Sequence, residues 1–382
     1  MKKLSKSMMV ITFFVAIISC ADKKQSTNGI IHLDVSKSYP EKIITIEDIA
    51  DVEYVQMEVH DDYLFSAIPK YISSSTIVIN DYSTHDFLFF TGDGKPKSKF
   101  NSYGQGPGEY TFVNIIVYDE TEDKLFVLSR NKILVYSSDG DFYYSLSLPS
   151  NVQINRMVNY DKESLLIHNG NDAYDSNFVR ISKKDASVIE EISIAGHKEI
   201  ELLARPESGE NIFIFIAVTY NIVRYKDGFL LSDNSKDTVF YHERNNELSP
   251  VLVRTPPIFE MNPYVYVNSF VEAGDYLFLR RTTVKFDKNA RGMMPSNALM
   301  INKNDQSVYK QKILLKDYTD KEIELCPEII SFSANSRMGF ISLRLAELKE
   351  ANKENKLSGR LKEMVEASDD ESNDIFMILY FK

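Results

Sequence analysis

The sequence has no tryptophan, two cysteines and six histidines among its 382 residues. Two cysteines cannot build a disulfide framework, and Cys326, between Leu325 and Pro327, is expected to be a small buried apolar residue. Without tryptophan, any stacking against sugar rings would fall to the 22 tyrosines and 23 phenylalanines. The histidines show no metal-ligand spacing, so no metal or cofactor is predicted; they are His32, His60, His85, His168, His197 and His242.

Basic residues are outnumbered by acidic ones. The chain has 44 Lys and Arg against 55 Asp and Glu, a net charge of −11, and no long basic block. Binding to the phosphate backbone of nucleic acids requires clustered cations, so nucleic acid is excluded as a partner. The 43% hydrophobic and 26% charged residues otherwise describe an ordinary globular chain.

No apolar run is long enough for a membrane-spanning helix. The longest, Met8–Ile18, is shorter than the roughly twenty residues that cross ~30 Å of hydrocarbon. It follows Lys2, Lys3 and Lys6, as in a secretory signal, and ends before Cys20, which resembles the bacterial lipoprotein signal with its acylated cysteine. We therefore expect a signal peptide over residues 1–19, a lipid-anchored tether over 20–28 and a folded domain over 29–382, held at the cell envelope with the outer membrane as the expected site.

The remaining chain repeats one pattern of short apolar strands joined by polar turns. In each unit two apolar strands are followed by an Asp, Asn or Gly turn and a third strand, which is typical of an antiparallel meander. Dipeptides such as Asp93-Gly94 tolerate the positive φ that two-residue hairpin turns require. The units cover residues 76–100, 125–148, 164–194, 228–253 and 276–315.

Such repeats predict an all-β fold, a β-propeller of four-stranded antiparallel blades. A sixth unit is divided between the two ends of the chain: Gly339–Leu343 and Asp374–Phe381 at one end, Ile30–Val35 and Val52–Val59 at the other. We expect Ile30–Val35 to pair with the strand around Phe376–Phe381, which would close a six-bladed ring without exposed edges.

Residues Leu345–Ala367 interrupt the sixth unit with a helical pattern. Apolar residues recur at i, i+3 and i+4 among Lys and Glu, and Ser358 is a candidate N-cap. The pattern predicts a short helical insertion whose apolar stripe packs on its own domain rather than on a partner. The stripe comprises Leu345, Leu348, Leu361, Met364 and Val365.

A distinctive run lies between the first and second units: Gly104-Gln105-Gly106-Pro107-Gly108-Glu109-Tyr110. Together with Asp48–Val55, Leu230–Thr238 and Leu252–Pro256, it resembles the six-bladed β-propeller lipoproteins of the Bacteroidetes, a family similar to NHL-type propellers. The likeness covers essentially the whole mature chain. It implies a propeller in the envelope and no particular activity.

The glycines of this run would let a backbone approach an anion, so a phosphate cradle is one interpretation. However, Pro107 removes an N–H group and no Lys-Ser/Thr pair follows. A rigid structural loop between blades is the preferred interpretation.

Arginines near strands in the second half are the candidate ligand-binding residues. Propeller ligands bind where loops and innermost strands line the central channel, and arginine there could hold a carboxylate or a sugar. Pairing with carboxylates between blades is the preferred interpretation of these arginines, and ligand binding is the alternative. The candidates are Arg224, Arg254, Arg280 and Arg281, together with Asp233.

The acidic run Asp369-Asp370-Glu371, with Asp374, lacks the ligand spacing of a compact calcium loop and is interpreted as a solvated turn.

Two functions remain open. The preferred one is a non-catalytic envelope propeller that binds a glycan, a peptide or a protein partner. The alternative is a lyase or hydrolase that acts on a glycan or peptide at the channel mouth. An enzyme needs convergent acid and base groups, so no catalytic residue is assigned from the sequence.

The lipid anchor can be tested by Cys20→Ala. Removal of residues 1–19 deletes three lysines and no acid, so the mature charge is −11 − 3 = −14, and an anionic bilayer would repel such a body. We expect the variant to leave the membrane fraction, measured by fractionation and immunoblotting. Its recovery in the membrane fraction would show that Cys20 is not the anchor.

Overall fold

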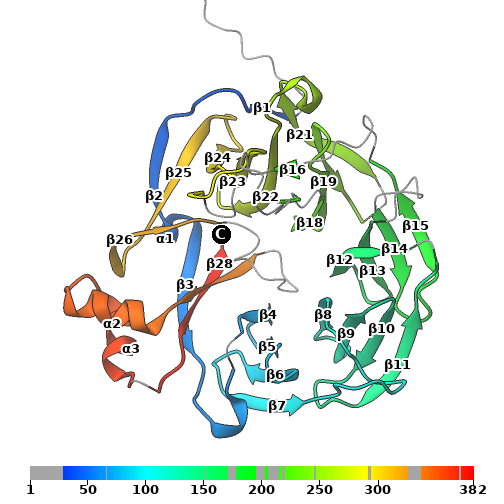
Figure 1. Ribbon diagram of the computed structural model, residues 1–382. Coiled ribbons are helices and arrows are strands. Elements are labelled where there is room, and N and C mark those ends of the chain that lie inside the picture. Colours follow the sequence, from blue (N-terminus) through cyan, green and yellow to red (C-terminus); the bar gives the residue numbers. More distant parts are fainter. Residues whose placement is uncertain are drawn as a thin grey trace, which may run out of the picture.

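The structure is a computed structural model that describes residues 29–65, 67–150, 152–170, 178–194, 203–204, 215–216, 220–244, 247–290, 294–325, 337–369 and 371–382. It is a six-bladed β-propeller whose blades stand around a common centre (Figure 1). In the described part of the chain, no helix is both long enough and apolar enough to cross a bilayer.

The first three blades are four-stranded antiparallel meanders. They contain β4 (Pro69–Ile72), β5 (Thr76–Asp81), β6 (Asp86–Thr91) and β7 (Pro96–Phe100); β8 (Ile115–Asp119), β9 (Lys124–Ser129), β10 (Lys132–Tyr136) and β11 (Phe142–Ser147); and β12 (Ile154–Asn159), β13 (Ser164–Asn169), β14 (Phe178–Ser182) and β15 (Val188–Ile192). The predicted repeats are therefore confirmed. Each repeat corresponds to the second to fourth strands of its blade.

The fourth and fifth blades each add strands to such a meander. Blade four contains β18 (Tyr220–Tyr225), β19 (Gly228–Asp233), β20 (Thr238–His242) and β21 (Leu248–Thr255), after a short pair of strands, β16 (Leu203–Ala204) and β17 (Phe215–Ile216). Blade five contains β22 (Val265–Ala273), β23 (Tyr276–Thr283), β24 (Ser296–Asn302), β25 (Val308–Leu315) and β26 (Tyr318–Ile323). The N-terminal strands β1 (Ile31–Asp34) and β2 (Glu41–Thr45) run parallel to β21 and β25.

The sixth blade joins the two ends of the chain. Its described strands are β27 (Met338–Leu343), β28 (Ile375–Phe381) and β3 (Ala50–Gln56), and β28 pairs antiparallel with β3 from Ile375↔Gln56 to Phe381↔Ala50. Closure by N- and C-terminal strands is thus confirmed, but the expected pairing of Ile30–Val35 with β28 is wrong. That segment contains β1, whose apolar residues Ile31 and Leu33 face the core between blades four and five instead.

Few helices interrupt the strands in the part of the chain that the structure describes. They are α1 (Ile46–Ile49) before β3, α2 (Leu345–Lys353) and α3 (Gly359–Ala367) between β27 and β28, and the 3₁₀ turns Asp61–Tyr63 and Ile258–Glu260. The helical insertion is confirmed, with Ser358 at the N-cap position of α3. Leu345, Leu348, Leu361 and Val365 are buried against blades five and six, so the apolar stripe packs on its own domain.

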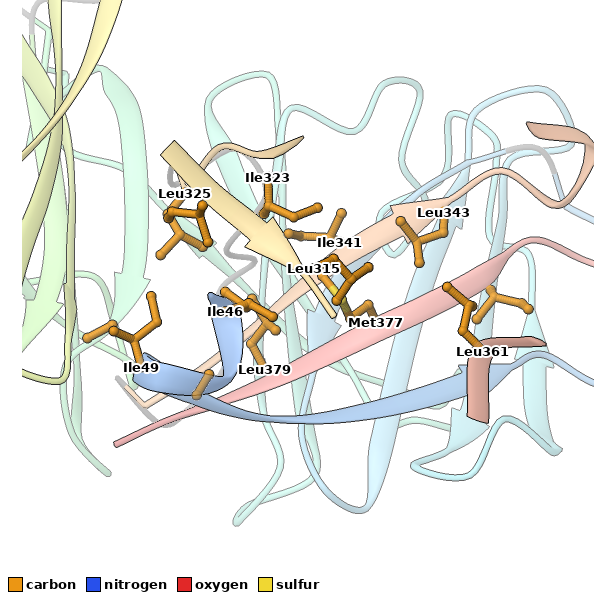
Figure 2. Close-up of a cluster of buried hydrophobic side chains, with 14 of the residues drawn as sticks. Ile46, Ile49, Leu315, Ile323, Leu325, Ile341, Leu343, Leu361, Met377 and Leu379 are labelled. Atoms are coloured by element: carbon orange, nitrogen blue, oxygen red, sulfur yellow. The ribbon is translucent and has the colours of Figure 1, made fainter. Parts of the chain in front are cut away.

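The hydrophobic core lies between blades rather than inside them. Six clusters of buried side chains each join two neighbouring blades, and together they run around the ring. Figure 2 shows the one between blades five and six, where Leu315 of β25 faces Ile341 of β27 and Met377 of β28. Both faces of the central strands are covered by neighbouring blades, so the sequences of these strands are continuous apolar runs.

Met377→Ala should test how much stability ring closure requires. Met377 is fully buried between β3 and β27, so truncation leaves a cavity and should cost about 2–5 kcal/mol of unfolding free energy. Denaturant unfolding of the mature domain measures this. The control, Ile43→Ala on β2, removes an apolar side chain that is 57% exposed and should change stability by about 0.5 kcal/mol or less; equal effects would contradict the role assigned to the β3–β28 interface.

Candidate functional site

A cavity of about 520 Å³ is lined by residues of three blades. Figure 1 shows two of the strands that line it, β18 and β22, and the C-terminus at the inner side of the ring. Blade four supplies the end of β18 and its turn, blade five supplies β22 and the turn after β24, and blade six supplies the start of β27 and the end of β28. The cavity therefore opens at one mouth of the central channel. Its lining residues are Arg224, Lys226, Asp227, Glu272, Lys303, Arg337, Phe381 and Lys382.

The channel-mouth cavity is rich in cations although the protein is acidic. Five of its side chains are Lys or Arg and two are acidic. Both acids already have partners: Lys303 Nζ lies 2.6 Å from Glu272 Oε1, and the Tyr241 hydroxyl donates to Asp227. That hydrogen bond holds the pKa of Asp227 below its usual range. Lys382 Nζ also lies 3.7 Å from the Asp51 carboxylate. Cationic side chains still outnumber acidic ones along the lining, so the charge of the site favours anions.

Arg224 and Lys226 are held at the mouth by the hairpin of β18 and β19. Arg224 Nη2 donates to the Asn159 carbonyl at 2.8 Å, and its guanidinium lies 4.7 Å from the centre of the Phe229 ring. Burial lowers the pKa of Arg224, and Arg244 contributes to the same shift. Lys226 occupies the turn with a left-handed φ of 49°, and its ammonium lies 5.2 Å from the Tyr225 ring centre.

The structure does not bring the other predicted ligand-binding residues to this cavity. The Asp233 carboxylate accepts hydrogen bonds from Ser235 within a turn. Arg254 is 2% exposed on β21, where it donates to the Pro256 carbonyl at 2.8 Å, and burial lowers its pKa to about 10.

The last two predicted arginines also join parts of the fold. Arg280 Nη2 lies 2.8 Å from the Glu324 carboxylate, and Arg281 Nη1 donates to the carbonyls of Val35 and Lys37 in the N-terminal segment. The lysines at the mouth were not among the residues predicted from the sequence. The signal for Lys226 was the two-residue turn before Gly228, which places polar residues where strands end.

The glycine-rich run forms the connection between β7 and β8. The Gly104 N–H donates to the Tyr110 carbonyl, and the Gly106 N–H donates to Glu109 Oε2 at 2.7 Å. A Cβ at Gly104 would lie 2.0 Å from Glu109 Oε2, so glycine makes room for the folded-back carboxylate. Two N–H groups that a phosphate cradle would need are therefore used within the loop.

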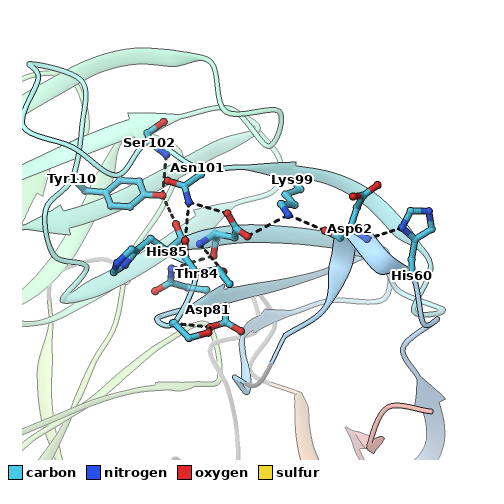
Figure 3. Close-up of polar contacts among 12 residues, drawn as sticks. His60, Asp62, Asp81, Thr84, His85, Lys99, Asn101, Ser102 and Tyr110 are labelled. Atoms are coloured by element: carbon cyan, nitrogen blue, oxygen red, sulfur yellow. Dashed lines mark hydrogen bonds and ion pairs between the residues drawn. The ribbon is translucent and has the colours of Figure 1, made fainter. Parts of the chain in front are cut away.

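Tyr110 anchors this loop to blade one, as Figure 3 shows. The buried hydroxyl donates to the His85 carbonyl at 2.7 Å and accepts from the Ser102 N–H at 3.1 Å. Nearby, Asn101 Nδ2 donates to the Thr84 carbonyl at 2.8 Å. Burial raises the pKa of Tyr110 to about 12.

Histidines and acids do not assemble a metal site in the described residues. His168 and His242 are buried, and burial lowers the pKa of each. In the acidic run, Asp369 accepts from the N–H of Glu371, and Asp374 accepts from the N–H of Leu345 at the start of α2. Cys20, His197, Cys326 and Asp370 lie outside the described residues.

Comparison with known proteins supports the same architecture. A family model described as Domain of unknown function (DUF4934) matches residues 30–380. A candidate exported protein of Bacteroides fragilis NCTC 9343 is similar in fold, with a TM-score of 0.61 and 14% identity, covering 92% of this chain and 99% of that one. A member of the DUF4221 family from Bacteroides vulgatus ATCC 8482 has a TM-score of 0.47 and 10% identity, covering 87% and 99%. None of the curated proteins matches this chain.

His168 should make folding stability depend on pH. Burial, aided by Lys236, lowers its folded-state pKa from 6.5 to about 3, so the unfolded chain binds more protons between these values. Stability therefore falls as pH decreases below the unfolded value, by about 2 kcal/mol from this group at pH 5. We expect His168→Gln to flatten the decline of unfolding free energy between pH 7 and pH 5, measured by denaturant titration. The exposed His32→Gln variant is the control, and an unchanged slope for His168→Gln would contradict the prediction.

Proposed function

We propose that this chain, which belongs to the family described as Domain of unknown function (DUF4934), is an envelope propeller that binds a carboxylate-bearing ligand at its channel mouth. The observation that carries the proposal is the cluster of five cationic side chains in a cavity whose two acids are already engaged. Guanidinium groups match the geometry of carboxylates. Arg224 is pre-oriented for this role by the Asn159 carbonyl and the Phe229 ring.

Binding without turnover agrees better with this site than catalysis does. A lyase or hydrolase would need an acid or base whose proton is available to the substrate. Glu272 and Asp227 instead serve as acceptors for Lys303 and Tyr241. The excess of cationic over acidic side chains in the lining would attract an anion, which supports a binding role. A uronic glycan or an acidic peptide has the required charge.

Attachment of the propeller to the envelope through lipid at Cys20 is part of this proposal. The basic residues and apolar run before Cys20 support export, as does the description of the Bacteroides fragilis protein of similar fold as a candidate exported protein. The polar residues 21–28 would then hold the propeller off the bilayer.

A uronic oligosaccharide tests the channel mouth. We would titrate the mature domain with trigalacturonate and with its methyl-esterified form, which has the same chain without the charges, by calorimetry. We expect binding of the acid only, weakened by added salt. Lys226→Asn removes one cation while asparagine tolerates the left-handed φ, and it should weaken binding about threefold.

The control is Lys97→Asn, which removes an exposed lysine from β7 on blade one and should leave affinity unchanged. Binding of the esterified form with equal affinity would contradict the carboxylate proposal. Mass spectrometry after hours of incubation reports intact ligand for a binding protein, whereas cleavage would favour the enzyme.

A further inference from the structure

A second cavity of about 800 Å³ lies between blades five and six, away from the channel-mouth residues. Its walls come from β25, β26, β27 and the start of α2. Figure 2 shows three of its apolar wall residues, Ile323 on β26 and Ile341 and Leu343 on β27. We call this the wedge cavity.

One polar side chain in the wedge cavity breaks the pattern of its strand. Along β25, alternate residues face blade six, and Ile313 and Leu315 on that face are buried in the core. Gln311 is the next residue on the same face, and the alternation of β25 predicts an apolar residue at this position. Gln311 is 8% exposed, and neither Nε2 nor Oε1 has a hydrogen-bond partner among the residues that the structure describes.

An amide left in this state destabilises the folded protein, because buried polar groups are nearly always hydrogen-bonded. A leucine would fill the same volume without that cost. Residues that break a local rule in this way concentrate at functional sites. The orphan amide is therefore the candidate contact for a ligand in the wedge cavity.

The rim of the wedge cavity carries charges that cancel. Three cations and three acids line it, and they pair with one another or with neighbours: Lys312 Nζ lies 2.9 Å from Glu322, and Arg344 Nη2 lies 2.7 Å from Glu347. Glu324 is paired with Arg280 at 2.8 Å. The rim therefore favours neither a positively nor a negatively charged ligand, in contrast to the channel mouth. An uncharged ligand fits such a rim.

We propose that the wedge cavity binds an uncharged ligand through a primary carboxamide that pairs with Gln311. The ligand oxygen accepts from Gln311 Nε2, and a ligand N–H donates to Gln311 Oε1. A primary carboxamide presents its C=O and one N–H on the same side, whereas a trans secondary amide does not. The apolar part of the ligand then contacts Ile313, Phe340 and Leu343.

Two sources supply this chemistry: a small free amide, and the side chain of Gln or Asn in a neutral peptide. The probes are N-acetyl-leucinamide for the first and acetyl-Ala-Gln-Ala-methylamide for the second. The methyl ester of N-acetyl-leucine is close in shape to the first probe and lacks its primary carboxamide N–H groups. Each is titrated into the mature domain by calorimetry or by protein NMR.

Gln311→Leu is the decisive variant. We expect at least one amide probe to bind saturably, the ester to bind more weakly, and Gln311→Leu to lower amide affinity at least tenfold while its melting temperature is unchanged or raised. Gln105→Leu, in the exposed loop after β7, and Lys226→Asn at the channel mouth should leave this affinity unchanged. No saturable binding of either amide, equal affinity for the ester, or full affinity in Gln311→Leu overturns the proposal.

Discussion

Apolar packing between neighbouring blades is the interaction on which the rest of this structure depends. The apolar faces of each blade are covered mainly by the blade before it and the blade after it, because the six main clusters of buried side chains are each shared by two sheets. An open row of blades would leave two apolar faces in water. The β3–β28 pairing buries both of these apolar faces, because it completes the sixth blade. Ile378 of the sixth blade then packs in one cluster with Ile77 of the first blade.

Closure also creates the two candidate sites. The channel-mouth cavity needs Arg224 from blade four, Glu272 from blade five and Phe381 from the closing strand of blade six. The wedge cavity lies beside the cluster that joins blades five and six. Neither site exists within one blade, so loss of closure would remove both sites together with stability.

The sequence indicated this architecture because its strongest local signals coincide with the strands most deeply buried. Strands such as β5 and β13 are covered on both faces and read as apolar runs followed by turns. The inner strands β4 and β12 were missed because they carry polar residues among the apolar ones, as in Ile154-Asn155-Arg156. Periodicity also could not choose between β1 and β3 as partners of β28, because both are short and partly apolar, and pairing is set by distant contacts.

The candidate site was less predictable for a related reason. Arginine in a strand can pair with nearby parts of the fold: Arg254 and Arg280 lie beside Asp237 and Glu324 of their own blades, and Arg281 donates to backbone carbonyls of the N-terminal segment. Lys226 and Lys303 lie in turns rather than in strands. They therefore line the channel-mouth cavity, where the strands of several blades end. The net charge of a chain therefore says little about its binding site, because the ring collects turn residues from three blades into one place and can give that place the opposite sign.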